Sequence, residues 1–101
     1  MRRVVWSRHA HNDFRGIILY IAQDNPSAAD NLADRIDRTI QALAATPTGR
    51  KGRVSGTYEK PVRGMPYIIA YALDDAGGRE TLTILRVIHG ARDWQEESWP
   101  E

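Results

Sequence analysis

The feature that most constrains the fold of this chain is a pair of amphipathic stretches joined by the short break Asp24-Asn25-Pro26. In the first stretch the apolar residues recur at intervals of three and four, which is the period of a helix that covers one surface. They are Phe14, Ile17, Ile18 and Ile21. We predict a helix from about Ser7 to Gln23, and the Ser7 hydroxyl can cap its first turn.

The second stretch begins directly after the break. Asn25 is a favourable N-cap, and Pro26 suits the first helical position, where the N–H that proline lacks has no partner to lose. The apolar face of this stretch extends to about Ala45 and consists of Ala29, Leu32, Ala33, Ile36, Ile40, Leu43 and Ala44. Two successive helices with so short a joint predict an antiparallel helical hairpin, whose apolar faces need a further surface to cover.

Strand-like runs supply that surface. One run, 4–6, precedes the helices, and three follow them at 53–62, 67–73 and 81–88. The connections at 63–66 and 74–78 contain glycine with proline or aspartate, which favour hairpin turns. The predicted order is therefore β-α-α-β-β-β. We expect an α+β fold in which the helical hairpin packs on one face of a small, mainly antiparallel sheet.

Composition narrows the class of protein further. A chain of 101 residues predicts a single domain over 1–101, with an acidic tail from about Gln95. The apolar and charged fractions, 42% and 27%, exclude a disordered, collagen-like or coiled-coil chain. The apolar run near the N-terminus, Val4-Val5-Trp6, is too short for a signal peptide or a membrane span. We expect a cytoplasmic protein that has no membrane partner.

No pattern in the sequence indicates a metal or a cofactor. The chain has no cysteine, and His9 and His11 are two residues apart rather than at the i, i+4 spacing that places two ligands on one helical face. Gly49 and Gly52 lack the lysine and hydroxyl residue that complete a phosphate-binding loop. We therefore expect neither a metal site nor a cofactor site.

Charge is unevenly distributed although the net charge is only +1. Between residues 50 and 63 there is one acid, Glu59. The basic residues of this segment are Arg50, Lys51, Arg53, Lys60 and Arg63. Such a segment is usually a solvated loop, although it can also contact nucleic acid or attract an acidic partner chain.

The run 82–94 ends in a way that a plain core strand does not require. Its apolar part carries Arg86, Gly90 permits a sharp exit, and the cluster His89, Arg92 and Trp94 follows. That cluster can present positive charge, a proton carrier and an aromatic surface. It is the first place where we expect a functional site.

The chain resembles the RelE/ParE superfamily, the toxin components of bacterial type II toxin-antitoxin systems. The resemblance covers nearly the whole chain and depends on the order and spacing of six segments. They are Trp6-Ser7, Tyr20-Ile21-Ala22, Asn25-Pro26 with Ala28-Ala29, Gly52-Arg53-Val54 with Gly56-Thr57, Pro66-Tyr67-Ile68-Ile69-Ala70-Tyr71, and Ile84-Leu85-Arg86-Val87-Ile88-His89-Gly90-Ala91-Arg92. The resemblance implies the β-α-α-β-β-β fold, and a cognate antitoxin that forms a hetero-oligomer with the toxin and neutralises it.

Two activities follow from the resemblance, because members of the ParE branch poison DNA gyrase and members of the RelE branch cut messenger RNA on the ribosome. The 67–71 strand and the 87–92 ending favour the ParE branch, which implies a protein that binds its target without chemistry of its own. The target-binding candidates are Arg63, Arg86, His89, Arg92 and Trp94.

The alternative is a ribosome-dependent endoribonuclease. Glu59 would then act as the base, Arg63 and Arg86 would hold the phosphate, and His89 would act as the acid. The RelE type uses a pair of lysines on the second strand and a tyrosine near the C-terminus, whereas this chain has Trp94 where that tyrosine is expected, and an indole cannot donate a proton as a phenol does. A third possibility is a degenerate homologue that binds an antitoxin and is not toxic.

Overall fold

The structure, a computed structural model, describes residues 1–75 and 80–90. Its strands form one five-stranded sheet in the order β1-β5-β4-β3-β2. The elements are β1 (Arg3–Trp6), α1 (Arg8–Asp24), α2 (Pro26–Ala45), β2 (Arg50–Lys51), β3 (Tyr58–Pro61), β4 (Tyr67–Asp74) and β5 (Thr81–His89). β1 is parallel to β5, whereas the other neighbouring strands are antiparallel. The predicted α+β fold with a mainly antiparallel sheet is confirmed.

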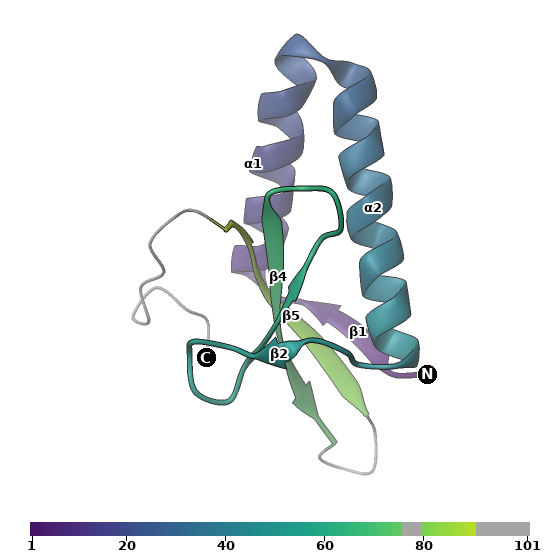
Figure 1. The fold of residues 1–101 in the computed structure, drawn as a ribbon, viewed down its shortest axis with the longest axis vertical. Helices are drawn as coiled ribbons and strands as arrows, with labels where there is room; N and C mark the ends of the chain where they lie inside the picture. Colours follow the sequence, from purple (N-terminus) through teal and green to yellow (C-terminus); the bar gives the residue numbers. More distant parts are fainter. Residues whose placement is uncertain (76–79, 91–101) are drawn as a thin grey trace.

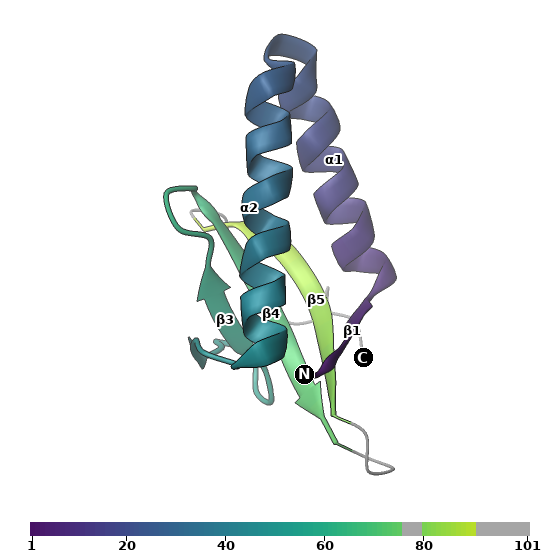
Figure 2. The same ribbon diagram turned by 90° about the vertical axis from the view of Figure 1, so that its right-hand side faces the viewer.

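The two helices form the predicted hairpin, which lies on one side of the sheet and extends past its end (Figures 1 and 2). Both predicted caps are present. The Ala10 N–H donates to the Ser7 hydroxyl oxygen at 3.0 Å, and the Ala28 N–H donates to the Asn25 side-chain oxygen at 3.1 Å. These bonds fix where each helix begins, so the short joint follows from local chemistry.

The predicted strand over 53–62 is wrong in its first half. Only Tyr58–Pro61 pairs as a strand there, and the preceding Arg50–Lys51 forms a short edge strand that was not predicted. Between them the chain turns back, since the Gly52 N–H donates to the Thr57 carbonyl at 2.8 Å. The Ser55-Gly56 dipeptide is a turn signal, and it marks this reversal in the sequence.

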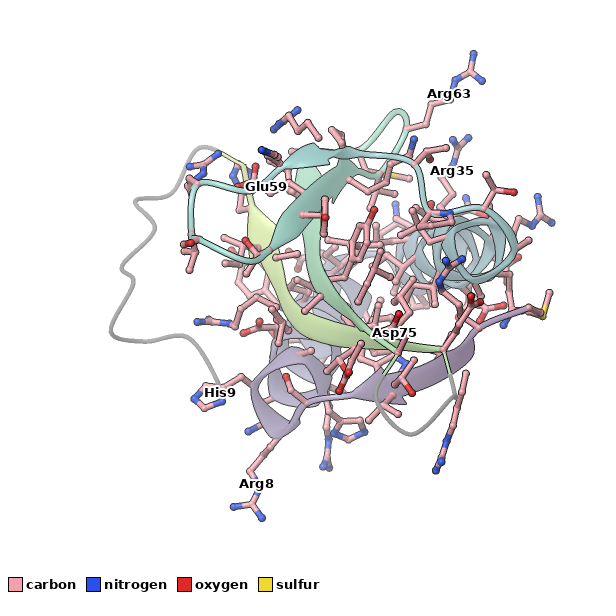
Figure 3. The ribbon with its side chains drawn as sticks, turned by 90° about the horizontal axis from the view of Figure 1, so that it is seen from below. Arg8, His9, Arg35, Glu59, Arg63 and Asp75 are labelled. Atoms are coloured by element: carbon pink, nitrogen blue, oxygen red, sulfur yellow. The ribbon has the colours of Figure 1, made fainter. Side chains whose placement is uncertain are left out.

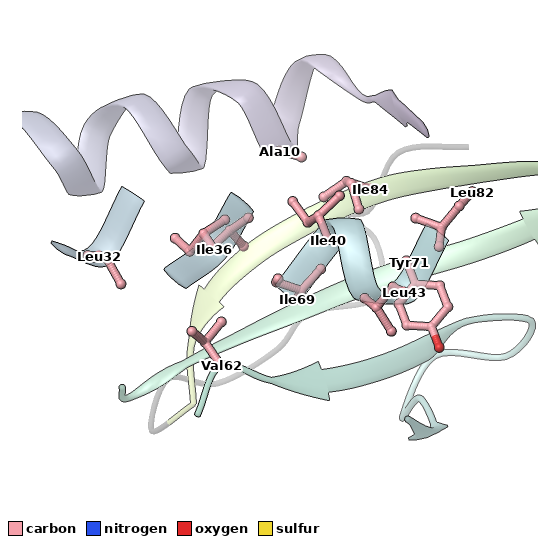
Figure 4. Close-up of a cluster of buried hydrophobic side chains, with 11 residues drawn as sticks. Ala10, Leu32, Ile36, Ile40, Leu43, Val62, Ile69, Tyr71, Leu82 and Ile84 are labelled. Carbon is pink, nitrogen blue, oxygen red and sulfur yellow. The ribbon is translucent and has the colours of Figure 1, made fainter. Parts of the chain in front are cut away.

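The hydrophobic core fills the space between the helical hairpin and one face of the sheet (Figure 4). Helix α2 contributes the largest share of its side chains, and β4 and β5 contribute the sheet side. The buried members are Ala10, Leu32, Ile36, Ile40, Leu43, Val62, Ile69, Tyr71, Leu82, Ile84 and Val87. The apolar stripe predicted for the second helix is therefore the face that α2 buries.

An irregularity in the β4–β5 pairing determines which side chains face the helices. Ala70 pairs with Arg86, but the next residue, Tyr71, pairs with Ile84, so Leu85 is an extra residue in β5. A bulge of this kind lets two core residues lie three positions apart on one strand. Ile84 and Val87 both enter the core as a result, and Arg86 lies between them.

Neither helix is both long enough and apolar enough to cross a membrane, within the parts of the chain that the structure describes.

Candidate functional site

Arg86 is tied to helix α1 by a bidentate ion pair. Its Nε lies 2.7 Å from Oδ2 of Asp13, and its Nη2 lies 3.1 Å from Oδ1. The Arg86 side chain is only 20% exposed and that of Asp13 only 18%. Arg86 therefore has a structural role in joining the sheet to the helical hairpin, whatever contacts it makes with a target.

The geometry of β5 explains why Asp13 lies there. β1 ends at Trp6, opposite Ile84, so the edge of β5 beyond that point has no neighbouring strand. The start of α1 supplies partners instead: the Ser7 hydroxyl donates to the Leu85 carbonyl at 2.9 Å, and Asp13 accepts from the Val87 N–H at 3.0 Å. Asp13 was not predicted, because no local sequence signal links residues 73 positions apart.

His89 is the last residue of β5 and pairs with Tyr67, the first residue of β4. The two rings meet edge to face with centroids 5.5 Å apart. The next residue, Gly90, donates its N–H to the Pro66 carbonyl at 2.8 Å, which holds this end of β5 against the β3–β4 turn. His89 is partly exposed at the same end of the sheet as that turn.

Glu59 is buried, with 2% of its surface exposed, and is enclosed by basic groups. Its carboxylate accepts from the Arg53 backbone N–H at 2.9 Å and lies 3.1 Å and 3.2 Å from the guanidinium groups of Arg53 and Arg50. Burial raises the pKa of Glu59, but the hydrogen bonds and charge of these neighbours outweigh it and leave the pKa below its ordinary value.

This arrangement gives Glu59 a structural role, because its carboxylate closes the β2–β3 hairpin. A general base needs a free lone pair near the substrate and a pKa not far from the working pH. Glu59 is a hydrogen-bond acceptor for two arginines and has a lowered pKa, which counts against that role. Two basic residues of the segment 50–63, Arg50 and Arg53, are therefore held against Glu59, which restricts their side chains.

Arg63 lies in the turn between β3 and β4 and is exposed. It lines a groove beside α2, on the helix side of the sheet. Glu59 points to the other face, because its neighbour Tyr58 stacks on the core residue Tyr71 and adjacent strand residues alternate in direction. Figure 3 shows Glu59 and Arg63 at separate places on the sheet.

The structure thus brings some of the predicted site residues near one another and separates others. Arg63 and His89 lie at the same end of the sheet, the first in the β3–β4 turn and the second where β5 ends. Glu59 and Arg86 both pair with Ala70, from the two strands that flank β4. Their backbones are therefore about 10 Å apart, which is two strand spacings, and each side chain is paired elsewhere. Arg92 and Trp94 lie outside the described residues.

Metal ligands are not gathered anywhere in 1–75 or 80–90: no three histidine or carboxylate side chains in these ranges are placed to hold one ion.

Comparison with known proteins identifies the family. The family model described as "ParE toxin of type II toxin-antitoxin system, parDE" matches residues 4–94. The chain belongs to the ParE toxin family. The predicted membership of the RelE/ParE superfamily is confirmed, and such a toxin implies an antitoxin partner.

Individual relatives agree with this assignment. The chain is 33% identical over 96 residues to Y4kP of Sinorhizobium fredii, a protein named as a toxin, with 94% of this chain and 95% of that protein covered. It is 34% identical over 93 residues to "Toxin RelE2" of Caulobacter vibrioides, with 91% and 99% covered. A RelE name therefore occurs among the relatives of a chain that the ParE family model matches.

Solved structures show the same fold. One, titled "Chromosomal ParDE TA system from P. aeruginosa", superimposes with a TM-score of 0.76 at 20% identity and covers 88% of this chain and 96% of its own. Another, "YoeB/ParE toxin from Agrobacterium tumefaciens", gives a TM-score of 0.61 at 14% identity, with 86% and 97% covered.

Proposed function

We propose that this toxin inhibits DNA gyrase by binding it and stalling it on cleaved DNA, without chemistry of its own. The observation that carries this proposal is the state of Glu59. The carboxylate expected to serve as the base of a nuclease is buried, is paired with two arginines and has a lowered pKa. The ParE family match over residues 4–94 supports the same conclusion.

The proposed contact surface is the end of the sheet where the β3–β4 turn and the end of β5 lie side by side. Arg63 is exposed there and His89 is partly exposed, so both can reach a protein surface. Arg86 is paired with Asp13, so a target carboxylate would compete with Asp13 for it. Arg92 and Trp94, which follow β5 in the sequence, complete the proposed set, since arginine and tryptophan are enriched in interface hot spots.

We further propose that the antitoxin has a C-terminal segment that is disordered when free and folds along the groove beside the helices and sheet. Burial of its apolar residues would offset the cost of ordering the segment. Basic residues of this chain would attract an acidic segment and accelerate its association. The antitoxin proposal would be contradicted if the neighbouring gene encoded no small partner, or if the encoded partner did not copurify with this chain. The electrostatic acceleration would be contradicted if the association rate were equal at low and high salt.

The alternative function is a RelE-like endoribonuclease, favoured by the relative named Toxin RelE2. Arg63 would hold the phosphate and His89 would protonate the leaving oxygen. If His89 has that role, His89→Ala should lower cleavage by about 100-fold or more. A degenerate homologue without toxicity is the third possibility.

One experiment separates the three functions. The toxin is induced in growing cells, and gyrase-dependent DNA breaks with an SOS response are measured beside translation rate and cleavage of messages. We expect DNA breaks, and a purified chain that inhibits gyrase supercoiling. Cut messages with rapid translation arrest would support the nuclease and overturn our proposal, and normal growth with neither effect would support the degenerate homologue.

The variants Arg63→Ala and His89→Ala sharpen the result, and Arg15→Ala on the exposed surface of α1 is the control. If the proposed surface contacts gyrase, both variants should weaken inhibition by about 10-fold each, which corresponds to an interface contact worth about 1.4 kcal/mol. Arg15→Ala should inhibit as the wild type does. Wild-type inhibition by both test variants would contradict the proposed surface.

A further inference from the structure

A groove of about 660 Å³ lies between α2 and the β3–β4 turn. Its lining is polar and strongly cationic, and consists of Asn31, Asp34, Arg35, Arg38, Thr39, Arg63 and Met65. Three arginines and one aspartate give the lining a charge of +3 − 1 = +2. Arg35 comes from α2 and Arg63 from the β3–β4 turn, and Figure 3 shows the Arg63 side chain extending outward from that turn.

The arginines of the groove differ from several others in the molecule. Arg2, Arg50, Arg53 and Arg86 each lie within 4.0 Å of a carboxylate. Within residues 1–75 and 80–90, no ion pair forms at Arg35, Arg38 or Arg63. Asp34 is four residues before Arg38 and yet forms no such pair with it. The three arginines of the groove are therefore not paired with a carboxylate of the described residues, and the lining keeps a net positive charge.

The groove is also held in shape. Nη1 of Arg35 donates to the Arg63 carbonyl at 3.0 Å, which fastens the β3–β4 turn to α2. Gly64 follows in the turn with a φ of +76°, and a Cβ atom there would come within 3.3 Å of Nη1 of Arg35. A glycine thus permits both the turn and the close approach of Arg35.

We propose that this groove binds the phosphodiester backbone of nucleic acid, with Arg35, Arg38 and Arg63 as the phosphate contacts. A guanidinium group presents planar, permanently charged donors that fit phosphate oxygens in pairs. Asn31 and Thr39 add neutral polar groups of the kind that contact phosphate and sugar. None of the described lining residues is aromatic, so bases have no surface on which to stack and binding is independent of sequence.

This inference goes beyond the proposed function and does not depend on the target, because DNA and RNA share the phosphodiester chemistry. The groove would be open to nucleic acid in the free toxin, and an antitoxin segment bound beside the helices and sheet would compete for it. The groove also lies on the helix side of the sheet, whereas Glu59 faces the other side. It is therefore separate from the ion cluster around Glu59.

The test is the fluorescence anisotropy of labelled 20-nucleotide single strands, one DNA and one RNA of the same sequence, titrated with the full chain. Three phosphate contacts predict a slope of about −2 for log K against log salt, so that affinity falls roughly 20-fold between about 50 and 200 mM salt. Arg38→Gln and Arg63→Gln should each weaken binding by about 10-fold at low salt and reduce the slope by about 0.7.

Arg15→Gln, an exposed change on α1 outside the groove, is the matched control and should bind as the wild type does. Thermal unfolding of each variant checks that folding is unaffected, as expected for exposed side chains. Equal affinity for the two strands identifies a backbone site common to both, and a preference for one strand identifies the natural ligand.

Three results would overturn the proposal. The first is binding of both strands that is undetectable or independent of salt. The second is a loss of affinity in Arg15→Gln as large as that in Arg38→Gln. The third is a chain that binds a polyglutamate peptide but binds neither the DNA nor the RNA strand. Because no gyrase or ribosome is present, a failure here leaves the proposed function standing, and failure of the gyrase assay leaves this proposal standing.

Discussion

Asp13 on α1 and Arg86 on β5 form a two-pronged ion pair, and the same carboxylate accepts the N–H of Val87. The Asp13 side chain therefore has two roles. It accepts a backbone N–H at the edge of β5 beyond the end of β1, and it pairs with an arginine next to the β5 bulge. The contact joins residues from opposite ends of the chain and lies between the helical layer and the sheet.

Removal of the Asp13 carboxylate should weaken this junction. Asp13→Ala removes the carboxylate that accepts from both Arg86 and the Val87 N–H. We expect a loss of about 1–2 kcal/mol in the free energy of unfolding, because both partners remain partly hydrated. Asp13→Asn keeps an acceptor for Val87 and should lose less. Urea denaturation measures both.

Asp37→Ala, at an exposed position of α2, is the control for the first variant and should change stability by less than about 0.5 kcal/mol. Equal stability of the Asp13→Ala and Asp37→Ala variants would show that the ion pair contributes nothing.

Glu59 should make the stability of the fold depend on acid pH. Its pKa is lowered in the folded state from the ordinary value of 4.5, so its contribution is complete above that value and is lost as the pH falls through the lower folded pKa. Glu59→Gln should therefore destabilise the protein by about 1–2 kcal/mol near neutral pH. The difference from the wild type should shrink below pH 4.5.

Urea denaturation at several pH values measures this difference. The control is Glu80→Gln, since Glu80 is exposed and its nearest approach to Arg2 is 3.8 Å. A difference between the wild type and Glu59→Gln that persists undiminished in acid would mean that the carboxylate charge is not what stabilises the β2–β3 hairpin.

The helical hairpin could be predicted from the sequence because its determinants are local. The spacing of apolar residues and the side chains of Ser7 and Asn25 act within a few positions of one another. The order of helices and strands along the chain was also predicted, apart from the β2–β3 hairpin. There residues 53–62 were predicted to form one long strand, whereas Ser55-Gly56 marks a turn that the ion cluster on Glu59 stabilises.

The candidate site was less predictable, because a composition of charges does not tell which charges pair. Glu59 and Arg86 have the residue types of a nuclease, but each is paired within the fold. Conversely, Arg35 and Arg38 have an ordinary position on a solvent-facing helix surface, and only the turn that carries Arg63 makes them part of a groove. The Asp13–Arg86 pair joins residues 73 positions apart in the chain, and the sequence pattern contains no signal that connects them.

Tyr71 connects the core to the segment between α2 and β2. Its hydroxyl donates to the Thr48 carbonyl, while its ring stacks on Tyr58 at a centroid distance of 5.6 Å. Tyr71→Phe keeps the stacked ring and removes only the hydroxyl. Because Thr48 is an exposed residue, water can replace the lost bond to its carbonyl. We expect a loss of about 1 kcal/mol by urea denaturation.

Tyr20→Phe is the control, because Tyr20 is 73% exposed on α1. A similar change in both variants would imply that the Tyr71 hydroxyl bond is not needed to hold residues 46–49.

Gly49 and Gly16 form a matched pair in which the same substitution should have opposite effects. Gly49 has a φ of +131°, and a Cβ atom there would lie 2.8 Å from the Glu59 carbonyl oxygen. Gly49→Ala therefore combines an unfavourable backbone conformation with a clash against β3, and should cost roughly 2–4 kcal/mol. Gly16 lies within α1 with nothing within 4 Å of its Cβ position, so Gly16→Ala should stabilise the protein by about 0.5–1 kcal/mol.

Thermal unfolding of both variants measures this contrast. Opposite shifts in Tm would show that Gly49 is required by the geometry of the chain where it enters β2 and that Gly16 is not required by the fold. Gly16 lowers the stability of α1 and is not required by the fold, so it is of interest whether a partner requires it. Gly16→Ala should therefore also be tested for gyrase inhibition and antitoxin binding. Loss of either activity in a more stable variant would place a partner against the Gly16 surface of α1, whereas unchanged activity would leave that surface free of both partners.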